Sequence, residues 1–575
     1  MKEKVLKLIK SKSLFAILLN IVFMAICVGL TSFSYVDVSD YNNSILICNQ
    51  HFYYNSSINY ILAVLIGTLQ YAVSDFNCFV LVEILLSFMA FSSFTFVFLD
   101  KYNIRKAVIF SIVINIIFTL NHYSYINSTK TAALLLTAGF LLVLNAIRNK
   151  RYSFSCWLGV VEILIGSFFN IVYFFVALGF AIAFFFGDMI AKRKYRLDFQ
   201  KLFWYFRPYL LMFLLIAALG VGLSQFSYTV NHATEQGKSY YDFSQLTKSI
   251  DSLPYPGYDE NAEEFKQAGI DNDSEYELLK NGYYDDSKML NNDALRLVSK
   301  LQKQENTKTV LYAMTEVFTD LGNNIVNLST RLIVMIVYLA ISIVFILYHK
   351  NRFSFFPLFY FIVGFLSSFV LRFLYDSNAN LTYGIWVFMI VMLLNSFNFE
   401  VLRRQKVNTS LREHNGYVVM SFLTVIGLAA GTGFLHYQYL QNNPPITEDS
   451  DARFLMSELN RNPDCYYVMD PPTMKTFVKS TENYLHPMWG FREGYLDNLD
   501  DFGFFHNNEL LRRRNLSENI YEAALSKKKI YVIDNNVVFK KEKYFTSHYA
   551  ADGKRVFYDP VCEPGGYKVY KVNMN

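Results

Sequence analysis

Long apolar runs alternate with short polar segments along most of the chain. A run of about 18 apolar residues is long enough to cross the hydrocarbon core of a membrane as a helix. Runs of this kind, a few of them shorter, lie at 14–32, 60–74, 77–98, 106–121, 129–147, 154–169, 171–187, 203–224, 331–348, 353–373, 381–398 and 417–437. The pattern therefore predicts an all-α polytopic membrane bundle.

Basic residues in the short loops predict the orientation of this bundle, because such loops favour the cytoplasmic side. Lysines and arginines collect at 100–106, 148–152, 191–196, 348–352 and 401–406. All five loops face the cytoplasm only if the short run at 60–74 is a re-entrant or interfacial helix. We then expect about 11 transmembrane helices, with the N-terminus inside and the C-terminus outside. In the alternative, 60–74 crosses, 154–187 is one long helix, and two basic loops lie outside.

The first apolar run follows a basic segment, MKEKVLKLIKSKS. It is longer than a signal-peptide core and no cleavage site follows it, so we expect a retained helix. Polar stretches then divide the chain into four regions. These are an N-terminal transmembrane module at 1–224 with a first external loop at 33–59, a large external loop at 225–330, C-terminal transmembrane helices at 331–439, and an external tail at 440–575.

The tail has the pattern of a small extracytoplasmic α/β domain. CYYVMD and KKIYVID have the composition of short buried strands, ITEDSDARFLMSEL that of a helix, and RVFYDPVCEPGGYKVYKV that of a hairpin. Cys465 and Cys562 both lie in this region. Outside the membrane they could form a disulfide or remain two free thiols, and the sequence leaves both open.

Composition agrees with a membrane protein. Of the 575 residues 53% are hydrophobic and 18% are charged, whereas a soluble domain carries roughly a quarter charged residues. The net charge is only +5 and no basic stripe is present, so no nucleic-acid partner is expected. Membrane lipid is the expected surrounding.

Two carboxylates, Asp37 and Asp40, follow the first apolar run. One interpretation is that they only mark the boundary with water. The other is catalytic, because the next residues, NSILICNQHFYYNSSINY, are amphipathic and aromatic, as in a segment lying along a membrane surface. A carboxylate in the wall of such a half-covered chamber could serve as general base for an acceptor hydroxyl.

The succession of a basic start, one helix, SDYNNSILICN, NYILAVLIGTLQY and SDFNCF resembles bacterial membrane proteins of the GT-C glycosyltransferase superfamily. The resemblance covers most of residues 1–330. Those proteins often carry Asp-Asp followed by an aromatic residue in the first external loop. The matching position reads Ser39-Asp40-Tyr41 and keeps only the second acid. The resemblance therefore implies that Asp40 is the general base and that Asp37 assists it.

The resemblance also implies the reaction. A sugar would pass from a polyprenyl-phosphate donor in the bilayer to a surface polysaccharide or teichoic-acid-like acceptor, outside the bacterial cytoplasmic membrane. An inverting reaction without a metal ion is favoured for a monophosphate donor, so no metal site or other cofactor is expected. A diphosphate donor would call for a divalent ion at Asp37 and Asp40.

A lipid-phosphate leaving group needs positive charge close by. Arg331 begins the run after the large external loop, and Arg372 lies near the outer end of its run, so both are candidates for binding the donor phosphate. Arg331 could instead extend from a helix end to the interface, and Arg372 could pair with Asp376. His51 is a candidate contact to the acceptor or an ordinary hydrogen-bonding residue.

Glu83 and Glu162 lie inside apolar runs, where a charge costs about 2.5–3.5 kcal/mol at the centre of a helix. A structural hydrogen bond to a neighbouring helix and a supporting role near the acceptor are both open. In the alternative class, a transporter or flippase of lipid-linked sugars, these acids are the candidates for proton coupling. That class predicts internal repeats, and none is seen. A third interpretation is an envelope protein that only anchors partners.

Overall fold

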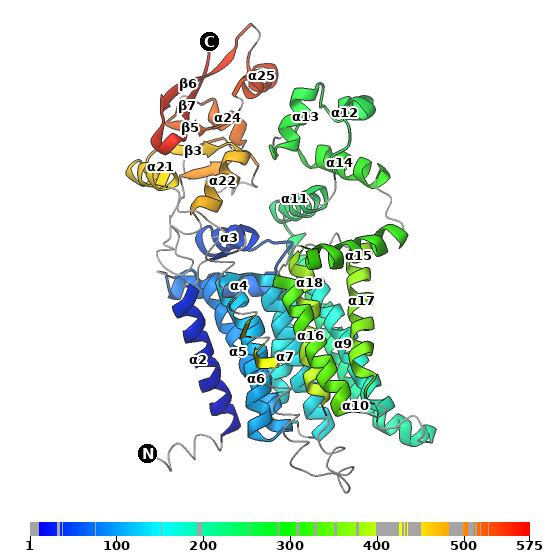
Figure 1. Ribbon diagram of the computed structural model, residues 1–575. Coiled ribbons are helices and arrows are strands. Elements are labelled where there is room, and N and C mark those ends of the chain that lie inside the picture. Colours follow the sequence, from blue (N-terminus) through cyan, green and yellow to red (C-terminus); the bar gives the residue numbers. More distant parts are fainter. Residues whose placement is uncertain are drawn as a thin grey trace.

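The chain folds into a helical bundle with a polar layer above one of its ends (Figure 1). We call this end, which lies nearest the C-terminal region, the upper end. The computed structural model describes residues 11–31, 35–36, 38–74, 76–150, 152–191, 198–251, 254–284, 286, 288–305, 310–326, 330–349, 353–374, 379–397, 425–427, 430–431, 434, 450–481, 498–503, 511, 515–517, 519–526, 528–536, 538–551 and 553–575.

Among the described residues, seven helices are long and apolar enough to cross a membrane. They are α2 (Lys12–Thr31), α5 (Cys78–Lys101), α6 (Ile104–Ser124), α7 (Ser128–Asn149), α9 (Ile171–Ala191), α10 (Phe199–Asn231) and α17 (Phe356–Leu374). Three shorter apolar helices pack alongside, namely α8 (Phe154–Phe169), α16 (Thr330–Tyr348) and α18 (Ala379–Ser396). By helix length and apolarity, the chain is a multi-pass membrane protein. The expected run at 417–437 falls mainly outside the described residues.

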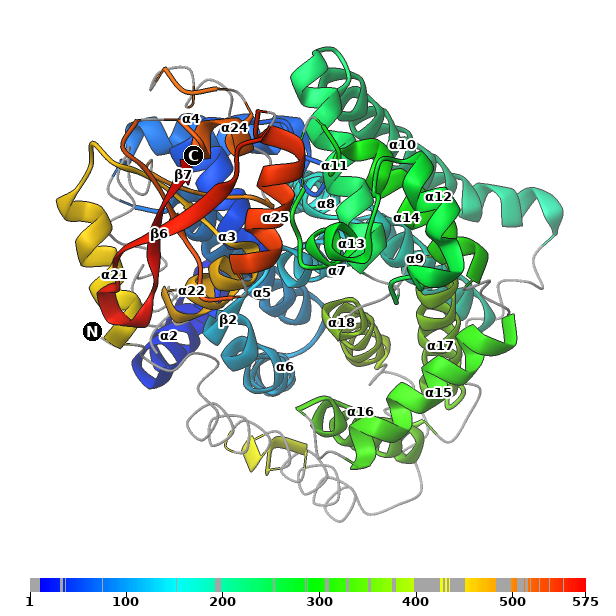
Figure 2. The same cartoon turned by 90° about the horizontal axis from the view of Figure 1, so that it is seen from above.

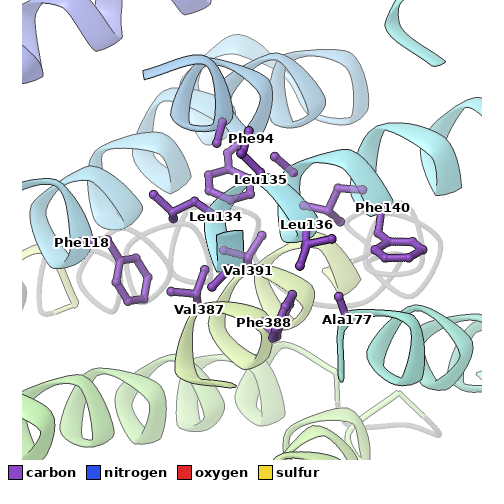
Figure 3. Close-up of a cluster of buried hydrophobic side chains, with 14 of the residues drawn as sticks. Phe94, Phe118, Leu134, Leu135, Leu136, Phe140, Ala177, Val387, Phe388 and Val391 are labelled. Carbon is purple, nitrogen blue, oxygen red and sulfur yellow. The ribbon is translucent and has the colours of Figure 1, made fainter. Parts of the chain in front are cut away.

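Helix α7 forms the centre of the bundle, and 94% of its apolar span is buried. Helices α5, α8, α9 and α18 pack against it. Figure 3 shows the shared core, in which α7 contributes Leu134, Leu135, Leu136 and Phe140. Inside a membrane, small and polar residues favour contact between helices, and α7 carries both kinds, including Thr131, Ala133, Thr137 and Gly139. The central position of α7 fits this composition.

Two glycines allow α7 and α8 to approach closely. A Cβ atom added to Gly139 would lie 2.5 Å from the carbonyl oxygen of Gly159, and one added to Gly159 would lie 2.8 Å from that of Gly139. Small residues at such crossings let helix backbones meet inside a membrane. The contact holds the middle of α7 against the first half of α8.

Short elements link the helices at the upper end. Strands β1 (Tyr35–Val36) and β2 (Tyr125–Ile126) pair in parallel, which brings the chain after α2 next to the start of α7. Helix α3 (Val38–Ser44) and a π-helical turn (Ile45–Asn49) follow β1. The segment that contains α3 is thereby held against the bundle.

Helix α4 (Tyr60–Ala72) lies across the upper ends of other helices rather than along them (Figures 1 and 2). At its beginning, the Asn59 backbone N–H donates to the carbonyl of Phe168 in α8 over 2.9 Å. Near its end, the Gln70 side chain accepts a 3.0 Å bond from the N–H of Cys78, which begins α5. Both ends of α4 are therefore held at the same level of the bundle.

The polar layer has two parts. The first contains α11 (Glu235–Asp251), α12 (Ala262–Gln267), α13 (Asp273–Lys280), α14 (Asn292–Glu305) and α15 (Val310–Val326). The second contains α21 (Ser450–Arg461), β3 (Tyr466–Met469), α22 (Pro471–Thr481), β4 (Leu499–Asp501), α24 (Ile520–Ala524), β5 (Ile530–Ile533), α25 (Val538–Tyr549), β6 (Val556–Cys562) and β7 (Val569–Met574). The second part is a small mixed α/β region, as expected from the tail sequence.

Its five strands follow the order β4-β3-β5-β7-β6. Strand β3 pairs in parallel with β4 and β5, whereas β7 pairs antiparallel with β5 and β6. The predicted strands in CYYVMD and KKIYVID, the preceding helix and the closing hairpin are all confirmed. Cys465 and Cys562 are free thiols. Strands β5 and β7 separate the strand that follows Cys465 from the one that ends at Cys562.

The two polar parts pack on one another through a shared hydrophobic cluster and through buried polar contacts. The Tyr283 hydroxyl donates a 2.6 Å hydrogen bond to Asp470 Oδ1, and His548 Nε2 lies 2.9 Å from Glu275 Oε1. Segments almost two hundred or more residues apart along the chain therefore form one body above the bundle.

A buried lysine joins two strand ends inside the α/β region. Asp470 follows β3 and Asp534 follows β5, and the ammonium group of Lys541 lies between their carboxylates, 2.8 Å from Asp470 Oδ1. All three side chains are almost fully buried. Burial raises the pKa of Asp534, and the nearby Asp470 charge raises it further. Lys541 is thus the counter-charge that these two carboxylates require.

Candidate functional site

A polar cavity of about 590 Å³ lies between the upper end of the bundle and helix α11. Its wall comes from α3, the segment before α4, the first residues of α7, the α8–α9 junction, the end of α10 and α11. Amide and hydroxyl side chains make up most of the wall. Of the described residues that line the cavity, Lys248 alone is charged. The cavity suits a ligand that is rich in hydrogen-bonding groups and large enough to be a sugar unit.

Asparagine side chains build this wall. Asn55 accepts hydrogen bonds from the N–H groups of Ser57 and Ile58, and its own amide donates to Asn43 Oδ1 over 2.7 Å. Asn231 at the end of α10 donates a 3.0 Å bond to the Asn55 carbonyl. Local bonds of this kind hold a loop in one conformation. These asparagines therefore shape the cavity.

Three helices begin at the cavity, each with an asparagine cap. Asn59 caps α4, Asn127 caps α7, and Asn170 accepts bonds from the N–H groups of Val172 and Tyr173 in α9. The cap of α4 and the first residues of α7 and α9 contribute to the lining. Helix N-termini carry partial positive charge, so the field in the cavity is electropositive.

Asp40 lies directly behind the wall and is fully buried. Its Oδ2 accepts a 2.7 Å bond from the backbone N–H of Ser128, and its Oδ1 accepts a 2.7 Å bond from the Ser128 hydroxyl. Ser128 is the first residue of α7, so the carboxylate is stabilised by the helix N-terminus as well. Ser128 itself lines the cavity. One hydroxyl group therefore connects the cavity to Asp40.

Lys248 enters the cavity from the opposite wall, on helix α11. Its ammonium group donates to the hydroxyl of Ser57 and, over 3.4 Å, to that of Ser56. The protein atoms packed around the ammonium group lower the pKa of Lys248 to about 8, against the opposing influence of the Asp40 carboxylate, although the side chain as a whole remains exposed. Lys248 and Asp40 therefore act on one another across the cavity.

Two tyrosines form an aromatic surface in the same wall. Tyr228 at the end of α10 and Tyr241 in α11 have ring centroids 5.6 Å apart in an edge-to-face arrangement. The His232 ring lies 4.0 Å from the first and 4.8 Å from the second. Both tyrosines line the cavity. Such a rigid, amphipathic surface can pack against the apolar face of a ring while its hydroxyl groups remain available.

Of the two arginines predicted to bind the donor phosphate, Arg372 lies away from the polar cavity. Arg372 pairs with Glu316 of α15 over 3.5 Å and lines a separate cavity of about 50 Å³ between α15, α17 and α18. Asp37 and Asp376 lie outside the described residues. Helix α16 begins at Thr330, but the side chain of Arg331 lies outside the described part.

His51, the predicted acceptor contact, lies in the segment between α3 and α4 with a positive φ of 53°. Its ring stacks on Tyr71 of α4, with centroids 4.2 Å apart. It is not among the residues that line the polar cavity. His51 therefore has an observed role in packing the loop on α4.

The two membrane acids are fully buried. Glu162 in α8 accepts a 2.6 Å bond from the Ser93 hydroxyl of α5. Glu83 lies in α5, one turn before Ser87, whose hydroxyl lies 2.7 Å from His122 Nε2 of α6. These contacts join neighbouring helices, and none of the five residues lines the polar cavity.

Ser128, Lys248 and the two tyrosines were not identified from the sequence. The Asn-Ser-Thr segment before α7 is a recognisable helix start, but nothing local pairs it with an acid 88 residues earlier. Nothing in the sequence distinguishes Lys248 from the other lysine of its amphipathic helix. Only the fold brings these residues to one cavity.

The described residues contain no group of three or more His, Cys, Asp or Glu side chains that could hold a metal ion. The site therefore consists of a buried carboxylate, a serine, a lysine and a wall of amides, hydroxyls and phenols. In comparisons with known proteins, no family model, curated protein or solved structure matches the chain. The chain is established as a multi-pass membrane protein, with seven candidate helical spans among its described residues.

Proposed function

We propose that the chain is a membrane glycosyltransferase of GT-C-like architecture, which moves a sugar from a polyprenyl-phosphate donor to a cell-envelope glycan on the outer face of the membrane. The observation that carries the proposal is the contact between Asp40 and Ser128 at the wall of the polar cavity. It supplies a base, a proton path and a space for the acceptor at one place.

The arrangement of helices supports an outward-facing site. With α4 as an interfacial helix, the ten helices of the bundle and the run at 417–437 give eleven crossings. The basic loops then lie at the end of the bundle opposite the cavity, where the positive-inside rule requires them. Both polar regions and the cavity would face the outside.

The chemistry of the cavity wall supports a sugar ligand. Amide and hydroxyl groups donate to and accept from sugar hydroxyls, and they do so without a fixed charge. Tyr228 and Tyr241 provide the aromatic surface against which a sugar ring can pack. A water-soluble polyol bound between such groups would be recognised through both its hydroxyls and its apolar face.

The base acts through Ser128 in this proposal. An acceptor hydroxyl in the cavity gives its proton to Ser128 Oγ while the Ser128 proton passes to Asp40 Oδ1. The acceptor oxygen then forms a bond to the anomeric carbon from the side opposite the leaving group. The bond between that carbon and the phosphate oxygen breaks, its electron pair leaves with the lipid phosphate, and the configuration is inverted.

Both Asp40 oxygens accept bonds from Ser128, which favours a hydrogen-bonding role over metal ligation. A polyprenyl monophosphate leaves as a stable anion and needs positive charge rather than a metal ion. Asp37 would assist Asp40, and Arg331 remains a proposed contact for the donor phosphate. Arg372 is less suited to that role, because it already pairs with Glu316.

A transporter of lipid-linked sugars is the second candidate, favoured by the buried carboxylates of Glu83 and Glu162 inside the bundle. A proton-coupled carrier needs such groups along its pathway. The 2.6 Å bond from Ser93 gives Glu162 a structural role that explains its position without transport. We therefore rank transport below glycosyl transfer.

The purified full-length protein in lipid vesicles tests the proposal. Polyprenyl-phosphate sugars carrying a radiolabelled sugar are offered with extracted envelope polymer as acceptor. The proposal predicts label in the polymer with wild-type protein and none with Asp40→Asn, together with release of polyprenyl phosphate. Label that moves across the vesicle membrane without entering a polymer would support the transporter instead.

A further inference from the structure

The polar cavity has an uneven distribution of charge. Its wall contains many neutral hydrogen-bonding groups, and Lys248 is the only charged side chain among the described residues that line it. A neutral sugar needs no ammonium group. The position of Lys248 therefore calls for an explanation in terms of the ligand.

Helix geometry adds to this positive charge. The cap of α4 and the first residues of α7 and α9 contribute to the lining. The N-terminus of α7 is already matched by the Asp40 carboxylate, which accepts the Ser128 N–H bond. Among the described residues of the lining, no carboxylate faces α4 or α9. Lys248 and these two helix ends together make a concave electropositive surface.

Lys248 is held in place by two serines and not by an acid. Its ammonium group bonds the hydroxyls of Ser56 and Ser57, which lie just before α4. Hydroxyls can turn to donate to an anion that binds beside the ammonium group, because each is both donor and acceptor. The ammonium group and the two hydroxyls therefore form a small set of hydrogen-bond donors on one side of the cavity.

We propose that Lys248, with Ser56 and Ser57, binds a phosphate group of the ligand. The proposal rests on the proposed function and deepens it, because it assigns to the sugar-binding cavity an anionic subsite that Arg331 and Arg372 were expected to provide. The phosphate belongs either to the lipid carrier of the donor or to a phosphorylated polyol acceptor. Both present the same monoester or diester oxygens to the lysine.

The direct test is binding by the purified full-length protein in lipid nanodiscs. Farnesyl phosphate represents the lipid source and glycerol 3-phosphate the polyol source, with farnesol and glycerol as uncharged counterparts. The variants are Lys248→Gln, Lys248→Arg, and Lys238→Gln as a matched control. Lys238 is an exposed lysine of the same helix that does not line the cavity.

We expect Lys248→Gln to weaken binding of one phosphate probe by about tenfold or more, as for loss of one charge-assisted hydrogen bond. The uncharged probes should bind all variants alike, Lys248→Arg should retain binding, and Lys238→Gln should match wild type. If Lys248→Gln weakens binding of farnesyl phosphate alone, the bound phosphate belongs to the lipid donor. If it weakens binding of glycerol 3-phosphate alone, the bound phosphate belongs to the acceptor.

Two results would overturn the inference, namely wild-type protein that binds neither phosphate probe, and phosphate binding that Lys248→Gln leaves unchanged. The outcome is independent of the proposed reaction, because binding is measured without turnover. If Lys248→Gln loses phosphate binding while Asp40→Asn still transfers sugar, the subsite stands and the assignment of Asp40 falls.

Discussion

Both carboxylate oxygens of Asp40 accept hydrogen bonds from a single residue, Ser128, each over 2.7 Å. The backbone N–H serves one oxygen and the side-chain hydroxyl serves the other. A fully buried carboxylate is costly unless it is satisfied in this way. The same hydroxyl lies between Asp40 and the polar cavity. It therefore stabilises the carboxylate and also connects it to a ligand in the cavity.

Removing the Ser128 hydroxyl should lower the rate of sugar transfer without unfolding the protein. In Ser128→Ala, Asp40 keeps the backbone N–H bond, so the protein should still fold. The proton path is lost, and we expect kcat for sugar transfer to fall by about 10²-fold or more, the usual contribution of a positioned general base. Thr129→Val is the matched control, because Thr129 also lines the cavity but makes no contact with Asp40 that the structure shows. Equal activity of both variants would contradict the relay.

Binding of a phosphate probe should depend on pH through Lys248. Its pKa is lowered to about 8 by the protein atoms that replace water around the ammonium group, so the ammonium form dominates below that pH and is lost above it. Affinity should therefore fall by about tenfold between pH 7 and pH 9, following the protonated fraction. Asp40 is the charged residue that acts on Lys248. Tyr241, with a pKa raised by burial, stays neutral over this range.

Lys248→Arg supplies the control for this profile, because a guanidinium group stays charged throughout. Its binding should be flat between pH 7 and pH 9. A falling profile in Lys248→Arg would show that the phosphate probe or another group of the protein titrates, and the assignment to Lys248 would then be wrong.

Lys541→Met should destabilise the α/β region strongly. It leaves the buried carboxylates of Asp470 and Asp534 without their counter-charge, which costs roughly 3–5 kcal/mol for a broken buried pair. Hydrogen exchange in β3 and β5 of the full-length protein should accelerate accordingly. Lys543→Met, an exposed change on the same helix, should leave exchange unaltered. Equal protection in both variants would show that the buried lysine is dispensable.

Arg372 should behave as a structural residue. It lies 3.5 Å from Glu316, and both side chains keep some exposure to solvent, so their coupling in a double-mutant cycle should stay below about 1 kcal/mol. Arg372→Gln should leave sugar transfer within about threefold of wild type, since a single lost partner of a solvent-screened pair changes little. A loss of transfer as large as that of Asp40→Asn would restore Arg372 as the donor-phosphate contact.

Much of the fold could be predicted from periodicity. Apolar runs marked the membrane helices, and apolar strand segments marked β3, β5 and the β6–β7 hairpin, because each pattern reports burial along one element. The site could not be predicted in this way. Asp40 meets Ser128, and Glu316 meets Arg372, across long stretches of chain. No local pattern encodes which helices lie side by side, so these pairs appear only in the folded protein.

The most direct test of the central claim is surface-glycan composition in cells that carry wild-type protein, Asp40→Asn or Glu162→Gln at equal membrane levels. Asn can still accept from Ser128 but cannot take a proton, and Gln can still accept from Ser93. The account predicts that Asp40→Asn alone removes one sugar from an envelope polymer. Intact glycan in Asp40→Asn, with loss of the sugar in Glu162→Gln, would contradict it and favour transport.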